Sequence, residues 1–151
     1  ILDGPTAERS DPELMASTAT AVSDVKTYEE RYPGGALKGS WSGGVADDGH
    51  FVLHGTETWY YEDGQKQWEV RYDLGRKIGT ETHWSPEGKT VWSWEHGEDG
   101  TSVWTRYWPN GTKRAESSWR NFMADGEARR WDRSGQVTSE ATFRRGRMQG
   151  P

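Results

Sequence analysis

The sequence has no cysteine, few aliphatic residues and no long apolar run. Without Cys the chain has no disulfides and no cysteine-ligated metal sites. No stretch approaches the roughly 20 apolar residues with which a helix crosses a bilayer, so no transmembrane helix is expected. Leu, Ile, Val and Phe total only 18 of the 151 residues, a share that is typical of disordered chains.

Aromatic residues offset this shortage. The chain has ten Trp and six Tyr, and each of these rings buries a large area when it packs. A thin fold held together by rings is therefore feasible where an aliphatic core is not. We expect a folded protein without a thick globular core.

Regularly spaced glycines mark a series of turns. Gly64, Gly88, Gly111 and Gly135 lie 24, 23 and 24 residues apart, and a period of this size is typical of repeat proteins. Each follows residues that favour tight reversals, such as Pro, Asp and Asn. An earlier copy ends at Gly35, 29 residues before Gly64, which predicts an insertion of about five residues within 45–49.

Apolar and polar residues alternate after each turn, which is the pattern of a β-strand with one buried face. The positions four, six and eight residues after the turn glycines hold Trp68, Val70 and Tyr72; Trp92, Trp94 and His96; Ala115, Ser117 and Trp119; and Ser139, Ala141 and Phe143. Helical periodicity is absent, and Gly or Pro interrupts every window long enough for a helix. The sequence predicts an all-β fold of about ten strands in five hairpins, joined into one elongated, twisted antiparallel sheet. A closed barrel is the alternative.

A second set of aromatic residues stands four residues before each turn glycine: Tyr60, Trp84, Tyr107 and Trp131. Equivalent residues of successive repeats form rows across a sheet, so we expect these rings to stack as a structural row. Rings of the opposite parity then belong to the other face, where they are exposed or covered by a partner.

Two segments resemble the MORN (membrane occupation and recognition nexus) repeat in its bacterial, antitoxin-like variant: Gly-Thr-Glu-Thr-Trp-Tyr-Tyr-Glu-Asp-Gly at 55–64 and Arg-Tyr-Trp-Pro-Asn-Gly at 106–111. The resemblance covers about residues 28–150 and implies tandem hairpins that serve as an interaction surface. We therefore expect a linker or tail over 1–27, with a short helix from Ser10 to Val22, and a repeat domain of about five hairpins over 28–151, the last repeat incomplete.

Charge changes sign along the chain. Residues 1–32 carry a net charge of −4 and residues 112–151 a net charge of +4, and most of the basic residues at this end are Arg. Arg favours bidentate contacts with carboxylates and phosphates, so the basic end suits an acidic protein, an anionic lipid or a polyanion. The total charge of −5 argues against nucleic acid as the partner.

Patterns of catalytic residues are absent. The four histidines, His50, His54, His83 and His96, follow no metal-hydrolase or nucleophile motif. Repeated carboxylates such as Glu57 and Glu81 are expected to form a solvated ladder, since equivalent positions offer equivalent environments. We expect no enzyme activity, no cofactor and no metal.

The candidate binding surface combines rings and guanidinium groups: Trp59, Tyr61, Trp104, Arg106, Trp108 and Arg130. Such residues are enriched at binding hot spots, which favours a non-enzymatic protein-interaction module or scaffold. The alternatives are an immunity or antitoxin protein that binds a toxin, and a cell-envelope carbohydrate binder. The expected partner is a protein of partly acidic character, a second copy bound through the sheet edges, or a membrane or cell-envelope surface. Export to the periplasm or surface of a bacterium is favoured over the cytoplasm.

Overall fold

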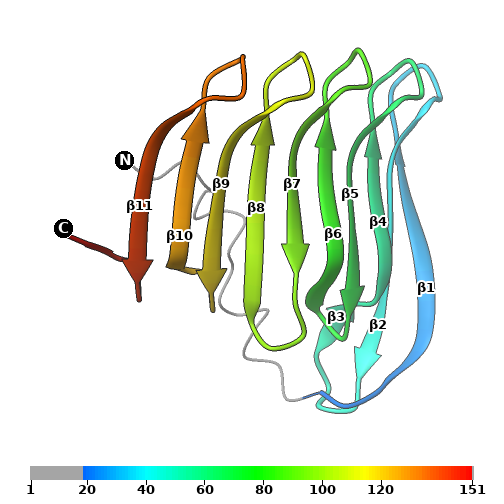
Figure 1. Cartoon of the computed structure of the whole chain (residues 1–151). Helices are drawn as coiled ribbons and strands as arrows, with labels where there is room; N and C mark the ends of the chain where they lie inside the picture. The colour runs from blue at the N-terminus through cyan, green and yellow to red at the C-terminus, as the bar shows by residue number, and fades with distance from the viewer. Residues whose placement is uncertain (1–18, 151) are drawn as a thin grey trace.

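A single antiparallel sheet makes up the part of the protein that the structure describes (Figure 1). The computed structural model describes residues 19–150, which contain twelve strands and no helix. The strands are β1 (Val22–Arg31), β2 (Leu37–Ala46), β3 (Phe51–Leu53), β4 (Gly55–Tyr60), β5 (Lys66–Asp73), β6 (Arg76–Trp84), β7 (Thr90–His96), β8 (Thr101–Tyr107), β9 (Lys113–Arg120), β10 (Met123–Trp131), β11 (Val137–Arg144) and β12 (Arg147–Gln149). The all-β prediction is confirmed, with two short strands, β3 and β12, beyond the expected ten.

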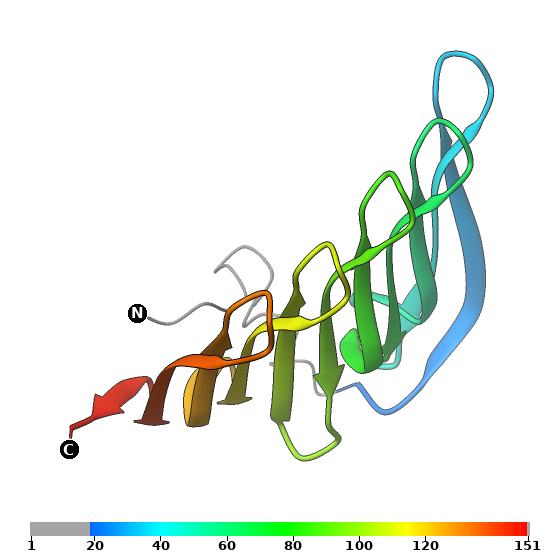
Figure 2. The same cartoon turned by 45° about the horizontal axis from the view of Figure 1, so that its top comes forward.

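The sheet is open. Its order follows the chain from β1 to β12, with β3 paired beside β4 on β2, and the two edge strands lie at opposite ends of the molecule. Figure 2 shows the successive hairpins stepping away from one another as the sheet twists. The meander is therefore confirmed, and the closed barrel is excluded.

Five equivalent turns line one end of the sheet. In each turn the first residue donates its N–H to the carbonyl of the fifth, as Tyr61 does to Gln65 at 2.8 Å. The fourth residue is the turn glycine, with a φ of 90° at both Gly64 and Gly111. This is a type I turn followed by a glycine bulge, and Gly is favoured because it takes positive φ without a Cβ clash. The predicted insertion also forms such a turn, at Ala46–His50, which leads into β3.

A second set of glycines lies at the start of β4 and within the first half of β6 and β10. Gly55, Gly79 and Gly126 have positive φ values of 106°, 66° and 110°, and the strand register shifts beside Gly79 and Gly126. Ser102 occupies the same repeat position, and β7 pairs with β8 without a register shift. A residue with a Cβ disfavours positive φ, so the irregularity is absent where serine replaces glycine.

The core lies on one face near the middle of the sheet. Trp94, Trp104 and Ala115 are buried there, and Trp92, Trp119 and Phe122 pack against them. Directly paired residues share a face, and Trp94 pairs with Trp104, which pairs with Ser117. We call this face the inner face and the opposite one the outer face. The predicted apolar alternation of the return strands is confirmed.

The predicted assignment of the outgoing strands to the two faces is wrong. The turn bulges shift the register between Trp59 and Tyr60 and between Arg106 and Tyr107, and a one-residue slip moves side chains to the opposite face. Trp59 therefore lies on the inner face, paired with Trp68. Trp104, expected on an exposed surface, is only 5% exposed.

The expected stacking of Tyr60, Trp84, Tyr107 and Trp131 is also wrong. Their cross-strand neighbours are Lys66, Thr90, Lys113 and Val137, respectively. Equivalent residues of successive hairpins are separated by an intervening strand, which places their backbones roughly 9.5 Å apart, twice the usual strand spacing. No ring contact among residues 19–150 joins two members of this set.

The N-terminal part bears on two further expectations. The short helix from Ser10 falls largely outside the described residues, and its expected last residue, Val22, instead opens β1. The expected boundary between tail and repeats, at 27/28, lies within β1. The sheet therefore starts at least six residues earlier, at Val22.

We expect Trp94→Ala to lower the free energy of unfolding by about 3–5 kcal/mol, the range for a large aromatic residue lost from a core. Trp94 is 0% exposed, whereas Trp84 is only half-buried, so Trp84→Ala is the control and should cost clearly less. Urea unfolding of both variants measures the difference. Equal losses would show that stability does not centre on Trp94.

Candidate functional site

A continuous row of side chains crosses the inner face from β4 to β11. Its members stand five residues before and four residues after each turn glycine, and each pairs with the next. In order they are Trp59, Trp68, His83, Trp92, Arg106, Ala115, Arg130 and Ser139. We call this set the aromatic–arginine row. It brings together three of the predicted binding residues, Trp59, Arg106 and Arg130.

Rings in and beside the row stack across strands. The ring centroids of Trp41 and Trp59 lie 5.8 Å apart with planes 12° from parallel, and those of His83 and Trp92 lie 5.7 Å apart at 19°. Tyr28 extends the first stack at 6.1 Å from Trp41. Parallel stacking of neighbouring rings directs ring faces at one another, so the row presents largely ring edges to solvent. These row rings are half-buried.

The C-terminal half of the row carries two guanidinium groups. Arg106 and Arg130 both pair with Ala115, which is 1% exposed. Both arginine residues are half-buried, as expected when long aliphatic stems cover a small apolar neighbour. The C-terminal part of the face therefore offers two cations on neighbouring outgoing strands.

Tyr61 and Trp108 do not belong to the row; each donates a hydrogen bond to a backbone carbonyl of the next repeat. Tyr61 Oη donates to the carbonyl of Trp84 at 2.7 Å, and Trp108 Nε1 donates to the carbonyl of Trp131 at 3.1 Å. Tyr32 donates to the carbonyl of Tyr60 in the same way at 2.7 Å. We call Tyr32, Tyr61 and Trp108 the bridging rings, because each starts a turn and hydrogen-bonds to the next turn. Burial, together with the charges of Glu87 and Asp63, raises the pKa of Tyr61, which keeps its hydroxyl a donor.

Trp108 is held between two cations. The guanidinium carbons of Arg114 and Arg133 lie 4.5 Å and 5.1 Å from its ring centroid. Such cation–π contacts contribute roughly 0.5–1 kcal/mol at exposed sites. Trp108 is thus already engaged within the protein.

An ion cluster is buried beside the core. Glu81 is 0% exposed and accepts hydrogen bonds from Trp68 Nε1 at 2.8 Å, Lys77 Nζ at 3.1 Å and His96 Nε2 at 2.9 Å. The Lys77 ammonium lies 5.5 Å from the Trp94 ring centroid. The pKa of Glu81 lies below its ordinary value of 4.5: burial acts to raise it, but the His96 hydrogen bond and the Lys77 charge outweigh that effect.

The expectation of a solvated carboxylate ladder is therefore wrong for Glu81. The equivalent Glu57 accepts a hydrogen bond from Trp59 Nε1 at 2.8 Å and is half-buried. The two environments differ because Glu81 stands next to the core residue Trp94, while Glu57 lies nearer the N-terminal end. His96 was expected to be a packed substitute for an aromatic ring, and it does pack 4.6 Å from Trp94.

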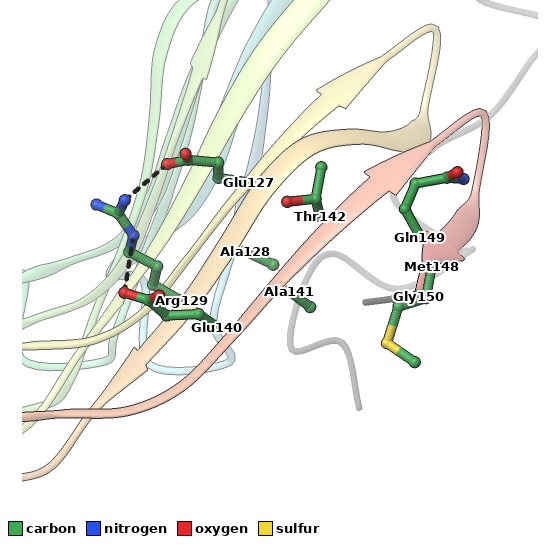
Figure 3. Close-up of a pocket in the computed structure, with 9 residues that line it drawn as sticks. All are labelled: Glu127, Ala128, Arg129, Glu140, Ala141, Thr142, Met148, Gln149 and Gly150. Atoms are coloured by element: carbon green, nitrogen blue, oxygen red, sulfur yellow. Dashed lines mark ion pairs between the residues drawn. The ribbon is translucent and has the colours of Figure 1, made fainter.

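A hollow of about 590 Å³ lies at the C-terminal edge, beside β11 and β12. Figure 3 shows Arg129 linked to Glu127 and Glu140, with nitrogen–oxygen distances of 2.9 Å and 3.6 Å. Ala128, Ala141 and Met148 also line the hollow.

Within residues 19–150, no group of three or more His, Cys, Asp or Glu side chains could hold a metal ion. The same residues contain no helix able to span a membrane.

Two hairpins match a known repeat. Residues 53–73 and 124–145 match the family model described as the MORN repeat variant. Each match covers an outgoing strand that holds one of these glycines, its turn and its return strand: β4 with β5, and nearly all of β10 with β11. MORN repeats are generally non-catalytic motifs that bind proteins or membranes. A comparison with curated proteins finds no match.

We expect Glu81→Gln to lower the free energy of unfolding by about 3–5 kcal/mol at pH 7, because it leaves the buried Lys77 without its counter-charge. The folded-state pKa of Glu81 is depressed, so its contribution is present above pH 4.5 and is lost as pH falls through the folded-state pKa. The difference between wild type and variant should therefore shrink below pH 4.5. Urea unfolding between pH 3 and 7 measures it, and a pH-independent difference would contradict the buried ion cluster.

Proposed function

We propose that this chain is a non-enzymatic interaction module that binds a protein of partly acidic character through the aromatic–arginine row. The observation that carries the proposal is the continuity of the row across eight paired strands, in which four half-buried rings are followed by Arg106 and Arg130. Trp and Arg are enriched at binding hot spots. A surface of this composition is an unusual one to leave facing water.

Charge favours an acidic partner at one end of the row. Residues 112–151 carry a net charge of +4, and Arg130 has no side-chain ion pair within residues 19–150. Arg guanidinium groups match carboxylates in bidentate geometry. We therefore assign the centre of the docking surface to β7–β10, where rings give way to cations.

The geometry favours a protein over a carbohydrate. Sugar rings bind by stacking on a free aromatic face, and in the Trp41–Trp59 pair each indole directs a face at the other. Ring edges between polar side chains instead suit the mixed surface of a protein. An immunity or antitoxin role would keep the same surface and make the partner a toxin protein.

The edge strand β11 offers a second mode of association, by pairing with another copy. Within the described part of the chain, β12 covers only Thr142–Arg144 of its outer edge. β1 carries two register irregularities and several charges, which are features that discourage edge pairing. The remaining edge of β11, Val137–Ala141, has one register shift, at Thr138, and a single charge, Glu140.

We expect Arg106→Glu with Arg130→Glu to weaken capture of protein partners at least tenfold, since two charged contacts of about 1 kcal/mol each are reversed. The matched control is Arg71→Glu with Arg76→Glu, which makes the same charge change at exposed positions outside the row. Pull-downs from the native source, quantified by mass spectrometry, compare the two variants with the wild type. Equal capture by both variants would overturn the assignment to the row.

We expect the chain to form a concentration-dependent dimer through β11, and Val137→Lys with Thr138→Lys to abolish it. Exposed lysine residues on an edge strand disfavour strand addition. Sedimentation equilibrium measures the dimer. The same association constant in the wild type and the variant would exclude β11 as the contact.

A further inference from the structure

The third turn lacks a bridging ring. At the turns that begin with Tyr32, Tyr61 and Trp108, the first residue bridges to the next turn. Ser85 stands at this position in the third turn, and its Oγ accepts a hydrogen bond from Lys89 N within the same turn at 3.2 Å. The gap between the third and fourth turns is therefore not bridged by a ring.

A cavity of about 330 Å³ occupies this gap. Two of the residues that line it are the repeat equivalents of the residues that contact Trp108 in the next repeat. The Trp108 ring meets Arg114, three residues after its own turn glycine, and Arg133, two residues before the next one. The corresponding residues around Ser85 are Val91 and Pro109, and both line the cavity.

The hydrogen-bond acceptor is also in place. Trp108 donates to the carbonyl of Trp131, four residues before the next turn glycine, and the corresponding residue in the cavity wall is Tyr107. Among residues 19–150, no side chain takes this place at the Tyr107 carbonyl. The cavity thus has both walls and the acceptor of a bridging-ring site.

The chemistry of the walls selects the ligand. Trp108 lies against two guanidinium groups, whereas the two equivalent residues of the cavity, Val91 and Pro109, are apolar and suit a neutral ring. Charged residues also line the cavity: Glu87, Lys89, Arg106 and Arg114. The Tyr107 carbonyl stands where the equivalent carbonyls accept from a donor at the far end of the ring. A phenol meets both conditions, as Tyr32 and Tyr61 do in their own gaps.

We propose that this cavity, the Ser85 pocket, binds a tyrosine side chain of a partner protein. The ring lies between Val91 and Pro109, and its hydroxyl donates to the carbonyl of Tyr107. This inference rests on the proposed function in one respect only, namely that the tyrosine belongs to a partner protein. Arg106 lines the pocket and also belongs to the aromatic–arginine row, so one bound segment can reach both.

The direct test is an NMR titration of the full chain with N-acetyl-tyrosinamide. We expect saturable shifts at Val91 and Tyr107, and intermolecular nuclear Overhauser effects between the probe ring and the Val91 methyl groups. N-acetyl-phenylalaninamide lacks the hydroxyl donor, so we expect it to bind about twofold to tenfold more weakly. An absence of shifts up to the solubility limit, or contacts confined to another part of the sheet, overturns the proposal.

Ser85→Tyr gives the protein its own ring at this position. We expect this variant to lose probe binding and to melt at a higher temperature, while the matched control Ser85→Ala binds like the wild type. Undiminished binding by a folded Ser85→Tyr variant overturns the proposal. Should that variant not fold, Val91→Asn provides the second test, because a polar wall should weaken probe binding. Probe binding is independent of partner capture, so the failure of this inference and that of the proposed function remain distinguishable.

Discussion

Residues 19–150 form a one-layer sheet and supply no second layer to cover its apolar face, and this constraint explains most of what the structure shows. Side chains on the inner face can be removed from water only by their neighbours on the same face. Trp94 reaches 0% exposure because Trp104 lies across from it, Phe122 packs edge-on against it at 5.6 Å and His96 lies beside it. Toward both ends of the sheet such neighbours become fewer, and burial declines.

The same constraint explains the buried ion cluster. An isolated buried carboxylate is strongly destabilising, but Glu81 receives three hydrogen bonds from side chains of its own face. Lys77 supplies the charge, and its ammonium group packs beside the rings of Trp68 and Trp94. The cluster thus links β5, β6 and β7 at the point where the core begins.

Neighbouring repeats are joined at their turns as well as along their strands. The bridging rings make these connections, and the exceptions follow the local chemistry of each turn. Asp132 begins the last of the five turns and bonds within that turn, to Ser134 and Gln136. Ser85 also bonds within its turn, and there a cavity replaces the ring. Variation of one residue per repeat therefore changes the surface without changing the hairpin.

Much of the fold was predictable from the sequence, because turn glycines and two-residue alternation are local signals. The faces of the outgoing strands were not, because each turn bulge adds a residue that simple counting of parity ignores. This is why Trp104 was expected on an exposed surface although it belongs to the core. The sequence did predict a shared face for Trp59, Arg106 and Arg130. All three stand five residues before a turn glycine, so the turn bulges affect their register in the same way.

Two features had no local signal. Glu81 occupies the same position in its repeat as Glu57 does in the preceding one, and only residues of the neighbouring strands make its environment different. Phe122 has a φ of 63° in a two-residue turn where Gly75 and Gly146 stand elsewhere. Such backbone is unfavourable for a bulky residue, and its ring packs against Trp94. Contacts with neighbouring strands, which a single residue's position in its repeat does not reveal, decide both cases.

We infer from these contacts that stability is concentrated at β6–β8, around Trp94 and Glu81, and declines toward both edges. Native-state amide hydrogen exchange tests it most directly, because it reports the free energy of opening at each strand. We expect backbone amides in β7 and β8 to be the most protected from exchange, and those in β1, β11 and β12 the least. Uniform protection across the sheet, or a maximum at either edge, would contradict it.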